Sequence, residues 1–174
     1  MITIRSAREG DLDGFLALAS QVEHWFGPMV GEPGFHRAVN AHIRDGAALV
    51  AESTERAGSA EPAGSARASG LVGGLLFGAE PPTYHVHWLV TSEHCRGAGV
   101  GRLLMAEAMR RYVAGPGTVE VVTFGPDHPG AVASGARVFY ERLGFRPAEP
   151  ADPGPEGGSR QIYRLPVPMP VRQV

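Results

Sequence analysis

Seven consecutive residues in the middle of the chain could form an anion-binding turn: Arg96, Gly97, Ala98, Gly99, Val100, Gly101 and Arg102. They stand between a segment that is strand-like and one that is helix-like. Three glycines within five residues let the backbone turn tightly and approach a ligand closely. The first turn of a helix presents unpaired N–H groups and the positive end of its dipole. The pattern predicts a cradle for a pyrophosphate, although a plain strand-to-helix turn would use the same glycines. A Rossmann G-x-G-x-x-G motif is disfavoured because it would need Gly at position 102.

Other side chains could transfer protons or act as ligands. His85 and His87 alternate with Val86 along a predicted strand, so we expect them to share one face. As a metal pair they lack a carboxylate or thiolate at ligand spacing, and we expect no metal site. Cys95 has no Cys–His–Asp spacing to activate it as a nucleophile and is better interpreted as a packing or surface thiol.

Composition excludes several classes of protein. The chain has 174 residues, and all of its 16 basic residues are Arg. Without Lys there is no P-loop lysine and no Schiff-base lysine. A single Cys excludes an internal disulfide, and a net charge of -2 argues against coating a nucleic acid. No apolar run is long enough to span a membrane, and the N-terminus lacks a signal-peptide core. We therefore expect a cytoplasmic protein with no nucleic-acid or membrane partner.

Hydrophobic patterning predicts one domain over residues 1–165, followed by an extended Pro-rich tail over 166–174. Strands are expected at 2–6, 47–53, 71–78, 84–91, 119–125 and 161–165, and helices at about 11–20, 35–45, 100–114 and 130–143. Residues 53–70 contain no Val, Ile, Leu, Met or aromatic residue, which predicts a disordered hairpin insertion. Three successive strands followed by a strand–helix–strand unit predict a mixed α/β fold, whose mostly antiparallel sheet has helices on both faces.

Two motifs together resemble the GNAT superfamily of acyltransferases (GCN5-related N-acetyltransferases). Its loop signature, Q/R-x-x-G-x-G/A, is matched by Arg96, Gly99 and Gly101. A second signature about 40 residues later is matched by Ala136, Phe139, Tyr140, Glu141, Gly144 and Phe145. The order of elements also agrees, so the resemblance covers residues 2–165.

The resemblance implies acetyl-CoA, or another acyl-CoA, as co-substrate in a cleft where two strands splay apart. Backbone groups of the glycine loop, from Arg96 to Arg102, would hold the pyrophosphate. Backbone groups of Leu89, Val90 and Thr91 would bind the pantetheine arm, and one amide there would polarise the thioester carbonyl. Tyr140 matches the family tyrosine that protonates the leaving thiolate.

Acceptor-side residues are less constrained by the motifs. His87 is the candidate general base, because it would be closer to the thioester than His85. The region that covers the acceptor site in the family corresponds to an apolar turn in this chain, so His24, Trp25, Phe26 and His85 are candidate acceptor residues. A small amine or a peptide would be the acceptor. The resemblance is also compatible with a homodimer.

These arguments predict an N-acetyltransferase that uses direct attack in a ternary complex. The alternatives are a catalytically silent CoA-binding sensor, or an acyltransferase with another acyl donor or a hydroxyl acceptor. One departure bears on the choice: the family often has Asn at the position of Ala133, which weakens an expected contact to the pantetheine arm or thiol.

Overall fold

The computed structural model describes residues 1–54 and 70–169, and the central part of the predicted insertion and the end of the predicted tail lie outside this description. In chain order the elements are β1 (Ile2–Ser6), η1 (Glu9–Asp11), α1 (Leu12–Ser20), α2 (Glu23–Phe26), α3 (Pro33–Arg44), β2 (Ala48–Ser53), β3 (Leu71–Glu80), β4 (Thr83–Thr91), η2 (Glu93–Cys95), α4 (Val100–Tyr112), β5 (Gly117–Phe124), α5 (Pro129–Ala133), α6 (Ala136–Arg142), β6 (Arg146–Ala151) and β7 (Arg160–Val167).

The strands form one seven-stranded sheet in the order β1-β2-β3-β4-β5-β7-β6. All neighbouring pairs are antiparallel except β4 and β5. A parallel pair needs a crossover connection, and α4 supplies it between β4 and β5. The predicted mixed, mostly antiparallel sheet is therefore confirmed.

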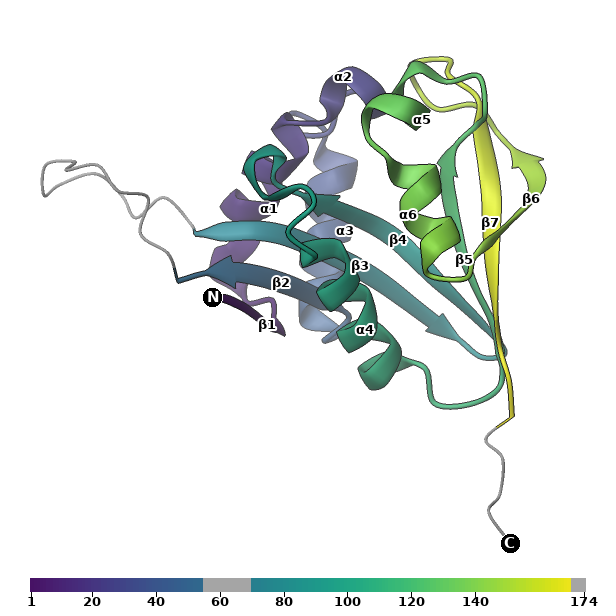
Figure 1. Ribbon diagram of the computed structural model, residues 1–174. Helices are drawn as coiled ribbons and strands as arrows, with labels where there is room; N and C mark the ends of the chain where they lie inside the picture. The colour runs from purple at the N-terminus through teal and green to yellow at the C-terminus, as the bar shows by residue number, and fades with distance from the viewer. Residues whose placement is uncertain (55–69, 170–174) are drawn as a thin grey trace, which may run out of the picture.

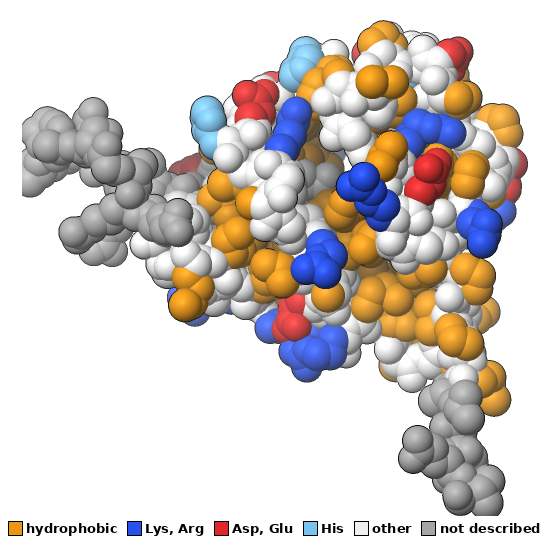
Figure 2. Space-filling model, in the orientation of Figure 1, with side chains coloured by type: hydrophobic (Ala, Val, Ile, Leu, Met, Phe, Trp, Pro, Cys, Tyr) orange, Lys and Arg blue, Asp and Glu red, His pale blue; other side chains and the backbone are white. Residues whose placement is uncertain are grey.

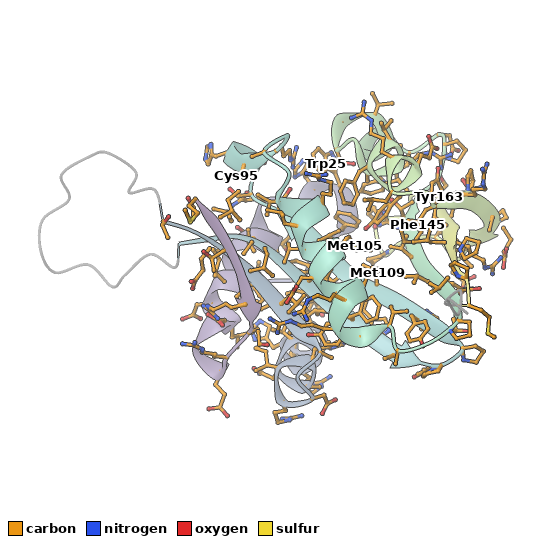
Figure 3. The ribbon with its side chains drawn as sticks, turned by 60° about the horizontal axis from the view of Figure 1, so that its bottom comes forward. Trp25, Cys95, Met105, Met109, Phe145 and Tyr163 are labelled. Carbon is orange, nitrogen blue, oxygen red and sulfur yellow. The ribbon has the colours of Figure 1, made fainter. Side chains whose placement is uncertain are left out.

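Helices cover both faces of the sheet (Figure 1). On one face, Phe15 of α1 and Val39 of α3 are buried against β2 and β3. On the other face, Leu104 of α4 is fully buried in the largest core cluster, which also includes Tyr140 of α6. Figure 3 shows Met105 on the side of α4 that faces Phe145 and Tyr163. The two helical layers thus fix β4 and β5 between them.

Four local features of the structure differ from the predictions. The helix expected over 130–143 is interrupted, because Gly135 adopts a left-handed conformation with φ +68 between α5 and α6. Val132, within this predicted helix, is 89% exposed. Strand β6 was not predicted because its sequence, RPAEPA, contains two prolines; it pairs only with β7 at the edge of the sheet, where proline is tolerated. Strand β7 continues to Val167, two residues into the predicted tail.

Among the described residues, no helix is both long enough and apolar enough to cross a membrane. The same residues contain no group of three or more His, Cys, Asp or Glu side chains placed to hold a metal ion.

Candidate active site

Strands β4 and β5 separate halfway along their length. Their parallel register runs from Thr83↔Thr118 to Val86↔Val121 and stops there, whereas β4 stays paired with β3 as far as Thr91. The edge of β4 over Leu89–Thr91 that is turned toward β5 therefore has no strand partner among the described residues. An unpaired strand edge offers backbone N–H and C=O groups to a ligand.

A β-bulge in β4 lies where the two strands separate. Leu76 of β3 pairs with Trp88, but the next residue, Phe77, pairs with Val86, so His87 is an extra residue in β4. The bulge changes the alternation of side chains. Val86 belongs to the core beside α4, whereas Trp88 packs with Phe15 on the opposite face of the sheet.

The glycine loop enters α4 with unpaired amides. Gly99 is the N-cap of α4 and lies in the left-handed region with φ +81, where L-residues with a side chain are disfavoured. The first backbone hydrogen bond of the helix runs from the Leu103 N–H to the Gly99 carbonyl at 3.0 Å. Within the described residues, the amides of Val100, Gly101 and Arg102 form no backbone hydrogen bond. This arrangement fits the anion cradle that the sequence predicts.

Helix α2 closes one side of the same region. The Glu23 carboxylate accepts hydrogen bonds from the Met29 amide at 2.7 Å and the Val30 amide at 3.4 Å, which ties down the turn after α2. The Arg96 guanidinium lies over the Trp25 indole, 4.9 Å from the ring centroid. The glycine loop and α2 are therefore in direct contact.

Tyr140 stands in apolar surroundings. Its side chain is 6% exposed and makes edge-on contacts with Phe139 and Phe145, with ring centroids 5.0 and 5.4 Å away. Burial raises the pKa of the Tyr140 phenol well above its ordinary value near 10. No side-chain hydrogen bond of its hydroxyl is formed within the described residues. The phenol is therefore protonated at neutral pH, and its proton is not donated to any described side chain.

These features meet in one cleft of about 410 Å³. Its walls include Tyr140, the Leu89–Thr91 edge, Trp25 and Phe26, and all of the predicted glycine-loop residues except Ala98. Figure 2 shows basic side chains around a hollow with hydrophobic walls, between the beginning of α4 and α6. Because the chain has no Lys, these basic side chains are arginines.

The predicted histidines lie outside the walls of this cleft. His85 and His87 share one face of the sheet, with their rings stacked at 5.8 Å, and His42 of α3 approaches the same group. The His42 Nδ1 lies 2.6 Å from the Ala38 carbonyl, and its Nε2 lies 2.8 Å from the His87 Nδ1. His24 lines a neighbouring pocket with Trp25. The assignments of His87 as base and of His24 and His85 as acceptor residues stay predictions.

The hydrogen bonds of His42 bear on the tautomer of His87. A carbonyl can only accept, so His42 donates to Ala38 through Nδ1–H. In the arrangement where the His42 Nε2 is the acceptor, the His87 Nδ1–H donates to it. The Nε2 of His87 then keeps its lone pair. Partial burial lowers the pKa of His87, and the nearby His42 and His85 rings lower it further. His87 is therefore neutral at pH 7, as a base must be.

Several residues of the site were not identified from the sequence. Cys95, interpreted as a packing or surface thiol, lines the cleft together with Val22, Phe124 and Arg142. These residues come from separate elements that only the tertiary fold brings together. No short spacing in the sequence marks them.

Comparisons with known proteins identify a matching family and similar structures. A family model for the acetyltransferase (GNAT) domain matches residues 45–147, whereas no curated protein matches the chain. A structure assigned to the GNAT family of acetyltransferases, from Desulfovibrio desulfuricans, has a TM-score of 0.67 at 20% identity, and the match covers 95% of this chain and 99% of that one.

Two further structures are similar over nearly their whole lengths. A Salmonella typhimurium protein assigned as an acetyltransferase, solved with its cofactor acetyl-CoA, has a TM-score of 0.67 at 15% identity, and the match covers 100% of this chain and 98% of that one. The ribosomal-protein-S18-alanine N-acetyltransferase of Escherichia coli has a TM-score of 0.63 at 17% identity, with coverage of 100% and 99%. At identities of 20%, 17% and 15%, the similarity to these three structures shows a shared fold.

Proposed function

The chain belongs to the GNAT family of acetyltransferases, and on this premise we propose that it transfers an acetyl group from acetyl-CoA to an amine by direct attack in a ternary complex. The observation that carries the proposal is the single cleft lined by the glycine loop, the unpaired edge of β4 and Tyr140. A neighbour of the same fold was solved with acetyl-CoA, which supports the choice of co-substrate.

The residues present fit such a co-substrate. At the positive end of α4, the amides of Val100, Gly101 and Arg102 have no backbone partner in the described part of the chain, which suits a pyrophosphate. A Cβ built on Gly99 meets no atom within 4 Å, so the space in front of the loop is open to a ligand. The backbone of Leu89–Thr91 would hold the pantetheine arm and orient the carbonyl.

Acetyl-CoA supplies an activated carbonyl as a thioester. In the overall transfer the amine nitrogen forms a bond to the carbonyl carbon and the carbon–sulfur bond breaks. The amine loses one proton, and the departing sulfur gains one. Tyr140 holds a proton that no described residue accepts, so we assign it as the proton donor to sulfur. The apolar surroundings that raise the pKa of Tyr140 would also raise the pKa of the CoA thiol.

His87 remains our candidate base for the amine proton. It precedes the open edge of β4 by two residues, and the hydrogen bond to His42 leaves its Nε2 free to accept. A bridging water is compatible with general-base catalysis. His87 acts from the face opposite Tyr140, so the donor and the acceptor of protons would stand on the two sides of the sheet.

A thiol-release assay with acetyl-CoA and a panel of amines tests the proposal. We expect amine-dependent release of CoA from the wild type. Gly99→Glu is the negative control, because a carboxylate side chain at the loop would repel a pyrophosphate and would also exclude it sterically. CoA binding without turnover on any acceptor would support the sensor alternative, which Ala133 favours. No CoA binding at all would mean that the cleft is misassigned.

A further inference from the structure

The walls of the cleft carry positive side chains and no carboxylate. Among the described residues that line it are three arginines, Arg96, Arg102 and Arg142, and no Asp or Glu. The Arg96 guanidinium lies over the Trp25 indole. Arg102 and Arg142 are exposed, and their side chains make no hydrogen bond or ion pair with any described residue. Two guanidinium groups at the cleft are therefore available to a ligand.

The other arginines of the same two helices have partners. In α4, Arg110 and Arg111 both donate to the Glu107 carboxylate. In α6, Arg137 donates to the Gln161 side chain at 2.8 Å. On each helix, the arginine without a described partner is thus the one that lines the cleft. This distribution indicates that the missing partner is an anion bound in the cleft.

The position of Arg102 is unfavourable for the helix itself. Arg102 stands in the first turn of α4, and this turn contains no acidic residue. The N-terminal end of a helix dipole is positive, so a cation near it is destabilising and an anion is stabilising. A ligand with negative charge beside the first turn would reverse the effect of Arg102. The protein itself supplies no such charge at the walls of the cleft.

We propose that Arg102 and Arg142 bind the 3′-phosphate of CoA and make the protein selective for acyl donors that carry it. This inference rests on the proposed function of the cleft as the acetyl-CoA site. The amide cradle would bind the diphosphate, which CoA shares with 3′-dephospho-CoA. The 3′-phosphate is a separate monoester, with an anionic charge of roughly 1.5 to 2 at pH 7. Guanidinium groups match a phosphate both in charge and in hydrogen-bonding geometry.

Calorimetric titration compares CoA with 3′-dephospho-CoA, which retains the diphosphate and the pantetheine arm. We expect the wild type to bind CoA about tenfold more tightly, as charge-assisted hydrogen bonds to one phosphate would give. Added salt should weaken CoA binding more than dephospho-CoA binding, because the additional contact is between exposed charges.

Arg142→Gln removes one of the two guanidinium groups. It should reduce the preference for CoA to about threefold by weakening CoA binding, and it should change the affinity for dephospho-CoA by less than about twofold. Arg102→Gln should weaken the binding of both nucleotides, because the first turn of α4 also borders the diphosphate, but CoA by about threefold more.

Arg146→Gln is the matched control, because Arg146 is also exposed, has no described side-chain partner and lies outside the cleft. It should leave the affinity for both nucleotides unchanged. Equal affinity of the wild type for the two nucleotides, or an equal loss for both on Arg142→Gln, would overturn the inference and leave the cleft as the CoA site. Selective binding without turnover on any amine would support the inference and reject the proposed acetyl transfer. If neither nucleotide binds, both proposals fail.

Discussion

The substitution Gly99→Asn separates two explanations of the glycine loop. Gly99 lies at φ +81, and a Cβ built there meets nothing within 4 Å. If the glycine serves only the turn, Asn should replace it, because Asn tolerates the left-handed region and is a favoured N-cap. Ala lacks both advantages and should lower the free energy of unfolding by about 1–2 kcal/mol.

A bound pyrophosphate changes this expectation. The open space at Gly99 borders the amides of Val100, Gly101 and Arg102, so a ligand on these amides would meet the new side chain. We expect Gly99→Asn to weaken CoA binding at least tenfold, a loss of about 1.4 kcal/mol. Its free energy of unfolding should stay within about 1 kcal/mol of the wild type.

Calorimetric titration with CoA and denaturant unfolding measure the two quantities. Gly46→Asn is the matched control: Gly46 has φ +69, meets no atom within 4 Å of a built Cβ and follows α3, outside the cleft. It should change neither quantity appreciably. If Gly99→Asn binds CoA with wild-type affinity and folds normally, the glycines serve the turn alone and the cradle is refuted.

Three other predictions follow from the same geometry. Tyr140→Phe should lower kcat by about 10²-fold or more without changing CoA affinity, as loss of general-acid catalysis does; stopped-flow thiol release decides this, and an unchanged kcat excludes the acid role. The lowered pKa of His87 means that the unfolded state binds its proton more readily, so the contribution of His87 to the free energy of unfolding should be constant above pH 6.5 and decrease as pH falls below it; denaturant unfolding should show this decrease as the difference in unfolding free energy between the wild type and His87→Asn. Leu104→Ala removes a fully buried side chain and should cost about 2–5 kcal/mol in unfolding free energy; a loss below 1 kcal/mol in the same assay would contradict the core assignment.

Local signals in the sequence predicted residues that the fold brings together in the cleft. The glycine loop and the Leu89–Thr91 segment lie on adjoining parts of the chain, and the strand–loop–helix order places them at one end of the cleft. Gly97 and Gly99 have positive φ, a conformation that Gly adopts much more readily than residues with a side chain. Short-range spacing was sufficient for these positions.

The pocket beside the cleft, lined in part by Asp127 and Glu156, depends on long-range packing and was less predictable. Asp127 and Glu156 come from loops that follow different strands, and the antiparallel register between Phe124 and Arg160 brings them together. The break between α5 and α6 has a similar origin. His128 caps α5, and the Ser134 hydroxyl donates to the Gly130 carbonyl at 2.5 Å, so the helix ends before Gly135. Periodicity alone carries no information about such caps.

The β-bulge at His87 links the two sides of the site. Without the extra residue, strict alternation would place Trp88 on the same face as Val86, toward α4. With it, Trp88 packs against Phe15 and Phe35, while Leu89 returns to the α4 side. Because β5 has already separated from β4 at this point, the strand edge between the two faces is open. A proton donor to the sulfur on one face and a base for the amine on the other could therefore serve one acetyl transfer only where the bulge and the separation coincide.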